Sequence, residues 1–120
     1  MKSNKMSYAF INAFEGLSIF FRQERNGRIQ LFIGLVTIGI GILLHVSTYE
    51  WMVILICIGA VLSAEMMNSA LEKLCDNLHP SIHLQIKIVK DIAAGGVLFI
   101  SVISLVIGAI IFIPKIWQLL

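Results

Sequence analysis

The sequence predicts an all-α integral membrane protein, with an N-terminal amphipathic helix on the membrane surface followed by three transmembrane helices. Its 120 residues are 58% hydrophobic and 13% charged, and the mean hydropathy is +0.93. Long segments carry no charged side chain, and a water-soluble domain of this size could not bury so much apolar surface. The length corresponds to one domain, residues 1–120.

The N-terminal segment, residues 1–28, is polar and amphipathic, which is not typical of a cleavable signal peptide. Within it, a narrow apolar stripe recurs at helical spacing, so we expect a helix lying flat in the membrane interface, either as a plain anchor or as part of a site. The stripe consists of Phe10, Phe14, Leu17 and Phe21. A polar cluster at residues 22–28 follows as a hinge.

Three apolar segments then predict membrane spans at residues 29–47, 51–77 and 84–118. Trp51 opens the second span at the position of an interfacial aromatic residue. Pro80 is expected to break the helix between the second and third spans.

The basic residues predict the orientation, because Lys and Arg concentrate on the cytoplasmic side of a membrane protein. Only Lys115 lies at the opposite end of the spans from the other eight. We therefore expect the N-terminus to be cytoplasmic and the C-terminus external. The eight cytoplasmic residues are Lys2, Lys5, Arg22, Arg25, Arg28, Lys73, Lys87 and Lys90.

Four polar residues of the second span share one helical face. Glu65, Asn68, Glu72 and Asp76 fall within about 80° of arc at 100° per residue. At roughly 1.5 Å per residue, Glu65 is about 21 Å from Trp51 and Glu72 about 31 Å, against a hydrocarbon core of about 30 Å. Glu65 is thus predicted within the inner leaflet and Glu72 near its surface.

This face, with Glu24 before the first span and Lys90 and Asp91 before the third, indicates a site at one membrane boundary. Carboxylates without His or Cys favour a hard cation such as Mg²⁺, and nearby lysines favour phosphate. A carboxylate that can act as a general base completes the requirements of phosphoryl transfer. An ion-coupled transport site and a structural polar seam remain alternatives. Cys57 and Cys75 have no disulfide or metal-ligand spacing, and we expect both to be reduced packing residues.

Three motifs resemble the small prokaryotic diacylglycerol kinase family. They are Phe-Arg-Gln-Glu-Arg-Asn at 21–26, Glu-x-x-Asn-Ser-Ala-x-Glu at 65–72 and Lys-Asp-x-Ala-Ala-Gly at 90–95. The first motif and the Ile-Phe-Ile-Pro-Lys ending look most like the Gram-positive branch, whose members phosphorylate undecaprenol. The more apolar loop at 78–84 and the bulky Val89 depart from the family pattern.

The resemblance implies a homotrimeric helical bundle in the bacterial cytoplasmic membrane, with active sites shared between subunits and ATP and a lipid alcohol as substrates. Glu65 would be the catalytic base next to the lipid hydroxyl, and Asn68 would bind substrate. Glu24 and Glu72 would hold Mg²⁺ on the ATP phosphates. The remaining nucleotide-binding residues would be Asp76, His83, Lys90 and Asp91.

The expected function is therefore ATP-dependent phosphorylation of undecaprenol at the cytoplasmic surface, which supplies undecaprenyl phosphate for cell-wall synthesis. Diacylglycerol, giving phosphatidic acid, is the alternative substrate. A small ion-coupled transporter subunit is a more remote alternative, because it would need polar groups across the full membrane depth. A non-catalytic assembly protein is the second rival.

Overall fold

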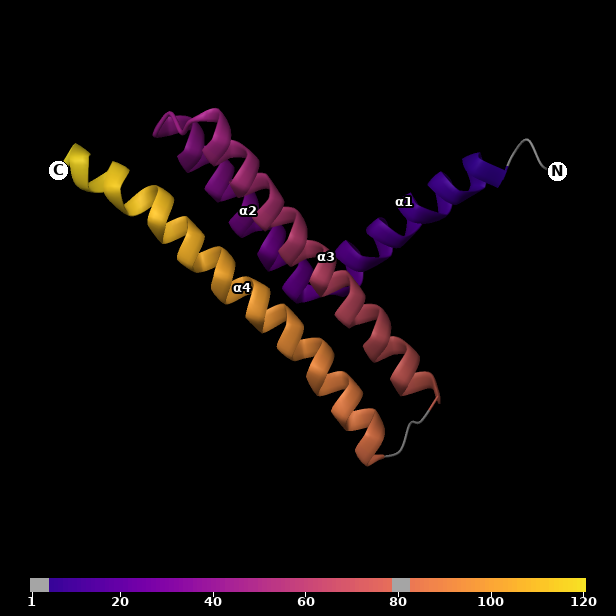
Figure 1. Ribbon diagram of the computed structural model, residues 1–120. Helices are drawn as coiled ribbons and strands as arrows, with labels where there is room; N and C mark the ends of the chain where they lie inside the picture. The colour runs from indigo at the N-terminus through magenta and orange to yellow at the C-terminus, as the bar shows by residue number, and fades with distance from the viewer. Residues whose placement is uncertain (1–4, 79–82) are drawn as a thin grey trace.

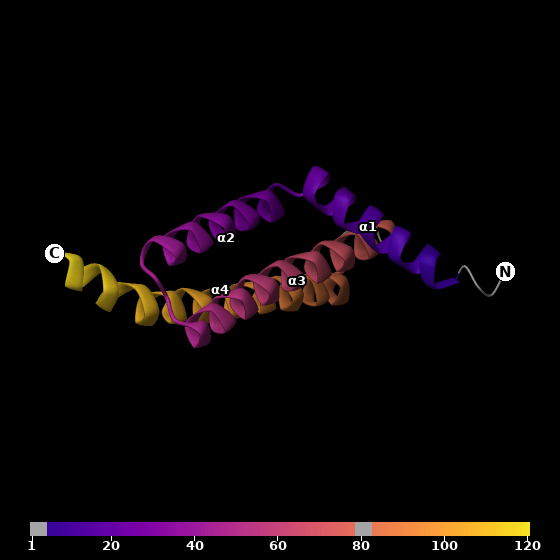
Figure 2. The ribbon, with the colours of Figure 1, turned by 90° about the horizontal axis from the view of Figure 1, so that it is seen from above.

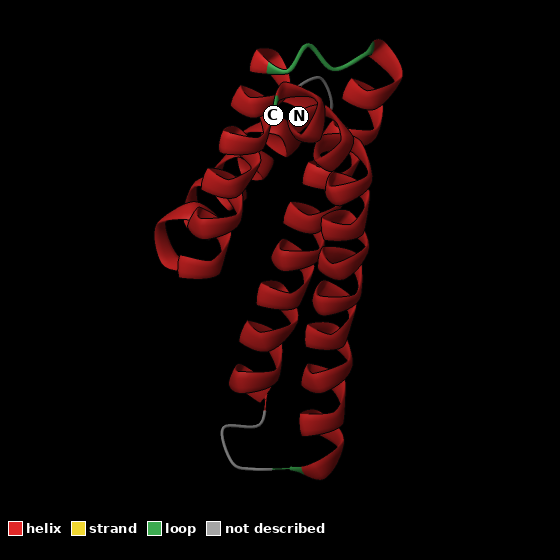
Figure 3. Ribbon diagram, turned by 90° about the vertical axis from the view of Figure 1, so that its left-hand side faces the viewer, coloured by secondary structure: helices red, strands yellow, loops and turns green. Residues whose placement is uncertain are grey.

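The computed structural model describes residues 5–78 and 83–120, which form four α-helices (Figure 1). These are α1 (Lys5–Gln23), α2 (Arg25–Leu43), α3 (Thr48–Leu78) and α4 (Leu84–Leu119). No strand is present in the described residues, as Figure 3 shows. The all-helical prediction is therefore confirmed. The expectations for Lys2 and Pro80 lie outside the described residues.

Three of the helices are long and apolar enough to cross a membrane, as the sequence predicts. α2 has 19 residues, α3 has 31 and α4 has 36. At 1.5 Å per residue these correspond to about 28, 46 and 54 Å, against a hydrocarbon core of about 30 Å. One or both ends of α3 and α4 must therefore extend beyond the hydrocarbon core.

α3 and α4 lie side by side, running in opposite directions, and α2 packs against α3 (Figure 1). Seen from above, α2 lies along one side of the α3–α4 pair, and the chain bends sharply between α1 and α2 (Figure 2). The whole chain measures 54 × 44 × 21 Å. This flat arrangement leaves most apolar side chains exposed, and Ile111 is the buried residue of α4. Such a surface suits contact with lipid rather than water.

The turn between α2 and α3 is fixed by polar contacts at the end opposite the α3–α4 loop. The Ser47 backbone N–H donates to Glu50 Oε1 at 2.8 Å, and the Glu50 N–H donates to Ser47 Oγ at 3.2 Å. This reciprocal capping box begins α3. Lys115 of α4 lies 3.1 Å from the same Glu50 oxygen, so one carboxylate joins both long helices. α4 continues through Pro114 to Leu119.

The corner between α1 and α2 is a single non-helical residue, Glu24. Arg28 Nη1 donates to the carbonyl oxygens of Phe21 at 3.0 Å and Arg22 at 2.8 Å, so it satisfies the free carbonyls at the end of α1. The buried ring of Phe20 lies over Gly27 of α2. A Cβ atom on Gly27 would come within 2.5 Å of this ring.

We expect Gly27→Ala to destabilise this corner, because the buried Phe20 ring must move to admit the methyl group. Overpacking of this kind costs about 1–3 kcal/mol. Gly16→Ala is the matched control, since its Cβ would meet nothing within 4 Å. Thermal unfolding in detergent should show a lower midpoint for Gly27→Ala and an equal or higher one for Gly16→Ala. Equal midpoints for the two variants would show that the contact does not restrain the corner.

Candidate active site

The polar face predicted on α3 is partly buried in the folded chain. Glu65 is 8% exposed and Ser69, one turn further on, is 7% exposed. Asn68 and Glu72 are half-buried, and Asn68 Nδ2 donates to Glu72 Oε1 at 3.2 Å. Asn68 Oδ1 is buried without a hydrogen-bond partner among the described residues. A buried acceptor of this kind is available to a ligand that can donate a hydrogen bond.

The corner residue Glu24 reaches across to this face. Ser69 Oγ donates to Glu24 Oε1 at 2.7 Å, and Lys73 Nζ lies 3.3 Å from the same oxygen. Glu24 occupies the N-cap position of α2, yet its side chain makes no capping hydrogen bond. A capping side chain stabilises a helix by about 1 kcal/mol. Glu24 gives up this local contact and instead connects the corner to α3.

The surroundings of Glu24 favour its charged form. The hydroxyl of Ser69 is the largest cause that holds the pKa of Glu24 below its ordinary value, and Lys73 and Arg28 act in the same direction. Partial burial opposes them, but the pKa of Glu24 remains lowered. Glu24 is therefore a carboxylate at neutral pH.

Glu65 is the deepest member of the acidic group. Its carboxylate interacts electrostatically with those of Glu24 and Glu72, and no hydrogen bond or ion pair joins it to another described residue. The structure thus brings together three carboxylates from the corner and from α3. They approach at the level where α3 passes from its apolar segment into its charged end. We call Glu24, Glu65, Asn68 and Glu72 the acidic cluster.

Two lysines of α4 are paired near its beginning. Lys90 Nζ donates to Asp76 Oδ1 of α3 at 2.8 Å, and Lys87 Nζ donates to Asp91 Oδ2 at 2.7 Å. Asp91 is therefore paired with Lys87, whereas Lys90 is held by Asp76. His83 is the N-cap residue of α4, with an exposed side chain.

The eight residues with predicted roles thus divide into the acidic cluster, the Asp76–Lys90 pair, Asp91 and His83. The sequence interpretation assigned no role to Ser69 and took Lys73 only as an indicator of orientation, although both contact Glu24. Helical spacing could have indicated that both residues lie near the site. Ser69 and Lys73 follow Glu65 at i+4 and i+8, on the same stripe of α3.

The atoms of the acidic cluster that could bind a metal ion are all oxygens, which are the ligands that Mg²⁺ prefers. No group of three or more His, Cys, Asp and Glu side chains is arranged to hold a metal ion in the part of the chain that the structure describes. Mg²⁺ in phosphoryl-transfer enzymes usually takes one or two carboxylates and completes its coordination with water and substrate phosphates. The acidic cluster fits that mode of binding.

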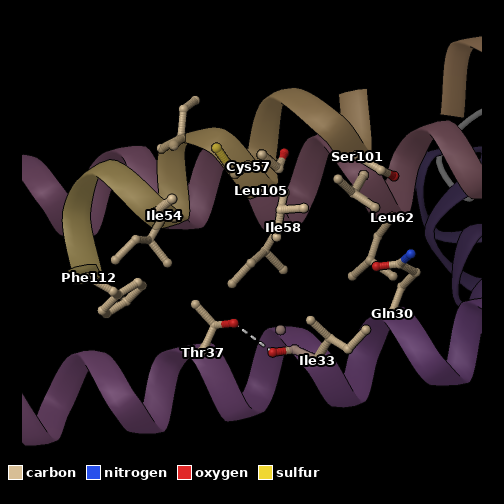
Figure 4. Close-up of a pocket in the computed structure, with 16 residues that line it drawn as sticks. Gln30, Ile33, Thr37, Ile54, Cys57, Ile58, Leu62, Ser101, Leu105 and Phe112 are labelled. Carbon is tan, nitrogen blue, oxygen red and sulfur yellow. Dashed lines mark hydrogen bonds between the residues drawn. The ribbon is translucent and has the colours of Figure 1, made fainter. Parts of the chain in front are cut away.

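An apolar cleft of about 510 Å³ lies between α2, α3 and α4, and its lining reaches Leu62, one turn of α3 before Glu65. Its lining begins with Gln30 and Leu62, and side chains of α2 face those of α3 and α4 across it (Figure 4). Thr37 donates to its own helix at Ile33 O, so its hydroxyl is satisfied. The Ser101 and Ser104 hydroxyls of the lining are buried without a partner among the described residues, but most of the lining is apolar, which suits an apolar chain.

Comparison with known proteins agrees with these features. The family model described as prokaryotic diacylglycerol kinase matches residues 11–112. An undecaprenol kinase from Bacillus subtilis is 36% identical over 112 residues, which cover 93% of this chain and 91% of that protein. A diacylglycerol kinase from a Synechocystis species is 33% identical over 113 residues, covering 93% of this chain and 65% of that protein. The resemblance seen in the sequence motifs is confirmed, and the chain belongs to the prokaryotic diacylglycerol kinase family.

Proposed function

We propose that this protein is an ATP-dependent lipid kinase that phosphorylates the hydroxyl group of undecaprenol at the cytoplasmic membrane surface. The observation that carries the proposal is the 36% identity to an undecaprenol kinase over 93% of the chain. The product, undecaprenyl phosphate, would serve cell-wall synthesis. Diacylglycerol is the second candidate substrate, supported by the 33% identity to a diacylglycerol kinase.

Glu65 is proposed as the general base. Its low exposure and its place within the apolar part of α3 suit contact with a hydroxyl that a lipid presents from the membrane. The Glu65 carboxylate takes the hydroxyl proton while the lipid oxygen forms a bond to the γ-phosphorus of ATP. The bond from that phosphorus to the β-phosphate oxygen breaks, and ADP leaves with the bonding electrons. Asn68, on the same face of α3 as Glu65, is proposed to contact the lipid head, whose single hydroxyl proton goes to Glu65.

The nucleotide is proposed to bind where α3 and α4 carry their charged ends. Lys90 would bind phosphate oxygens of the nucleotide. These oxygens would take the place of Asp76, which is the partner of Lys90 in the free protein. Asp76, His83 and Asp91 lie on the same charged ends and are proposed to contact the rest of the nucleotide. These three side chains are exposed, so an arriving nucleotide can reach them from water.

Glu24 and Glu72 are the residues proposed to hold Mg²⁺ with the ATP phosphates. Bound there, the ion would supply positive charge that offsets the charge of the phosphates during transfer. Ser69 occupies Glu24 Oε1, and Asn68 occupies Glu72 Oε1. Among the described residues no hydrogen bond or ion pair reaches Oε2 of either carboxylate, so this second oxygen is available to a ligand.

The apolar cleft supports a lipid substrate. It is lined by α2, α3 and α4, reaches Leu62, which lies one turn of α3 before Glu65, and runs toward the opposite end of the spans, where Ile54 and Phe112 line it. An isoprenoid or acyl chain in this cleft would bring its terminal hydroxyl to Glu65. Moving a methylene group from water into an apolar site contributes about 0.8 kcal/mol. A lipid chain that enters the cleft from the membrane gains much less, because it is already in an apolar environment. The cleft would therefore orient the substrate more than it would increase its affinity.

The orientation and the oligomeric state are also proposals. The asymmetry of Lys and Arg favours a cytoplasmic N-terminus and site. A homotrimer with shared sites would close the exposed nucleotide side, because one flat protomer cannot surround both a nucleotide and a lipid head.

The role of Glu65 predicts that Glu65→Gln inserts and assembles normally but loses lipid phosphorylation by about 10²–10⁴-fold, the usual contribution of a general base. Glu15→Gln, the same change at an exposed residue of α1, is the control and should keep wild-type turnover. Turnover of labelled ATP by purified protein measures both. Unchanged turnover by Glu65→Gln would remove it as the base and would favour a non-catalytic assembly protein.

Substrate preference is tested by incubating purified protein with labelled ATP and undecaprenol or diacylglycerol in the same detergent. We expect faster phosphorylation of undecaprenol. Faster phosphorylation of diacylglycerol would select the second candidate. Transfer to neither lipid would overturn the lipid kinase proposal.

A further inference from the structure

Lys73 of α3 connects two parts of the α1–α2 corner. Its Nζ donates to Gln23 Oε1 at 3.1 Å and lies 3.3 Å from Glu24 Oε1. Gln23 is the last residue of α1, and Glu24 is the corner residue itself. One ammonium group therefore holds the end of the surface helix and the proposed metal-binding carboxylate against the same point of α3.

Few polar contacts hold the corner against α3. Within the described part of the chain, the Gln23–Lys73 hydrogen bond is the polar contact that joins α1 to α3. α1 packs against α2, and its apolar residues Phe10 and Phe14 are exposed. Without Lys73, the position of the corner relative to α3 would depend on the Ser69 hydroxyl, while Arg28 and the packing of Phe20 would still join α1 to α2.

The charge of Lys73 also stabilises the carboxylates of the site. The charge of Glu65 interacts with those of Glu24 and Glu72, and like charges in a partly buried site repel each other. The Lys73 ammonium forms an ion pair with Glu24 and so offsets part of this repulsion. Lys73 is half-exposed, and two turns of helix, about 12 Å, separate it from Glu65. It therefore contacts the corner without entering the lipid side of the site.

We infer that Lys73 is a positioning residue, which holds the corner so that Glu24 is presented to the acidic cluster and to the incoming nucleotide. This inference rests on the proposed function for its kinetic consequence, but the placement of the corner can be measured without any substrate. A mobile Glu24 would be in position for the nucleotide for a smaller fraction of the time. The apparent affinity for ATP–Mg²⁺ would then fall in proportion to the fraction of time that Glu24 is in position.

The variant Lys73→Met keeps most of the aliphatic side chain and removes the ammonium group. We expect faster hydrogen–deuterium exchange of the backbone amides at residues 18–24 in detergent without ATP, since the corner loses its contact with α3. The KM for ATP–Mg²⁺ should rise about fivefold, the value of one exposed ion pair, with the KM for the lipid alcohol unchanged. Lys73→Arg should restore both properties, because a guanidinium group can donate to both oxygens.

Two further variants distinguish the effect of the Lys73 contact with the corner from the effect of its charge. Gln23→Ala leaves the Lys73 charge in place but removes one of its two contacts, so it should also speed exchange at residues 18–24 and raise the KM for ATP–Mg²⁺. Lys87→Met removes a charge from α4, where Lys87 pairs with Asp91, and should leave exchange at residues 18–24 unchanged.

Wild-type exchange at residues 18–24 in both Lys73→Met and Gln23→Ala would overturn the inference. A raised KM in Lys73→Met with wild-type behaviour of Gln23→Ala would show that only the charge of Lys73 matters, and would overturn it too. Failure of the proposed function is distinguishable, because it would abolish the kinetic effect and leave the exchange result intact.

Discussion

The hydrogen bond from Ser69 to Glu24 is the contact on which the geometry of the site depends. It joins the corner, the one non-helical residue between α1 and α2, to a buried position of α3. A charged carboxylate next to the membrane is costly unless it is hydrogen-bonded and paired. Ser69 and Lys73 supply both requirements. The same contacts that make the charge tolerable therefore also determine where Glu24 lies.

The second constraint is the thickness of the membrane. α3 and α4 are longer than the hydrocarbon core, so their charged ends can reach water while the adjoining apolar turns remain in lipid. Glu65 lies on the apolar side of this boundary, and Asp76 and Lys90 lie on the charged side. A phosphoryl group passed from a nucleotide to a lipid has to cross between these two environments. The sequence of polar residues along one face of α3 suits that transfer.

Much of this fold could be predicted from the sequence, because lipid imposes simple rules. Long uncharged segments predicted three membrane-crossing helices, and the Phe10–Phe14 spacing predicted a helix before them. The structure contains three helices long and apolar enough to cross a membrane, and the N-terminal helix α1. The family was also predictable, since the motif from Glu65 to Glu72 is specific and the comparison confirms it.

The contacts between helices were harder to predict. Helical spacing shows which residues of α3 share a face, but it does not show which residue of another helix meets them. The pairing of Lys90 with Asp76, and of Asp91 with Lys87, depends on how α4 packs against α3. The contacts of Glu24 depend on the angle of the corner, which Phe20, Gly27 and Arg28 set together. The proposed roles of these residues remain to be tested by experiment.

The most direct test of the central contact is the pKa of Glu24, measured by NMR on the ¹³C-labelled carboxyl group in wild-type protein and in Ser69→Ala. We expect a pKa below the ordinary value for Glu in wild-type protein, and a higher pKa in Ser69→Ala, since the hydroxyl is the largest cause of the lowering. A lowered folded-state pKa stabilises the fold above the pKa of the unfolded chain, and this contribution is lost as the pH falls through the folded-state value. Wild-type protein should therefore lose stability on acidification across that range more than Ser69→Ala does. An identical Glu24 pKa in the two proteins would contradict the proposed connection between the corner and α3.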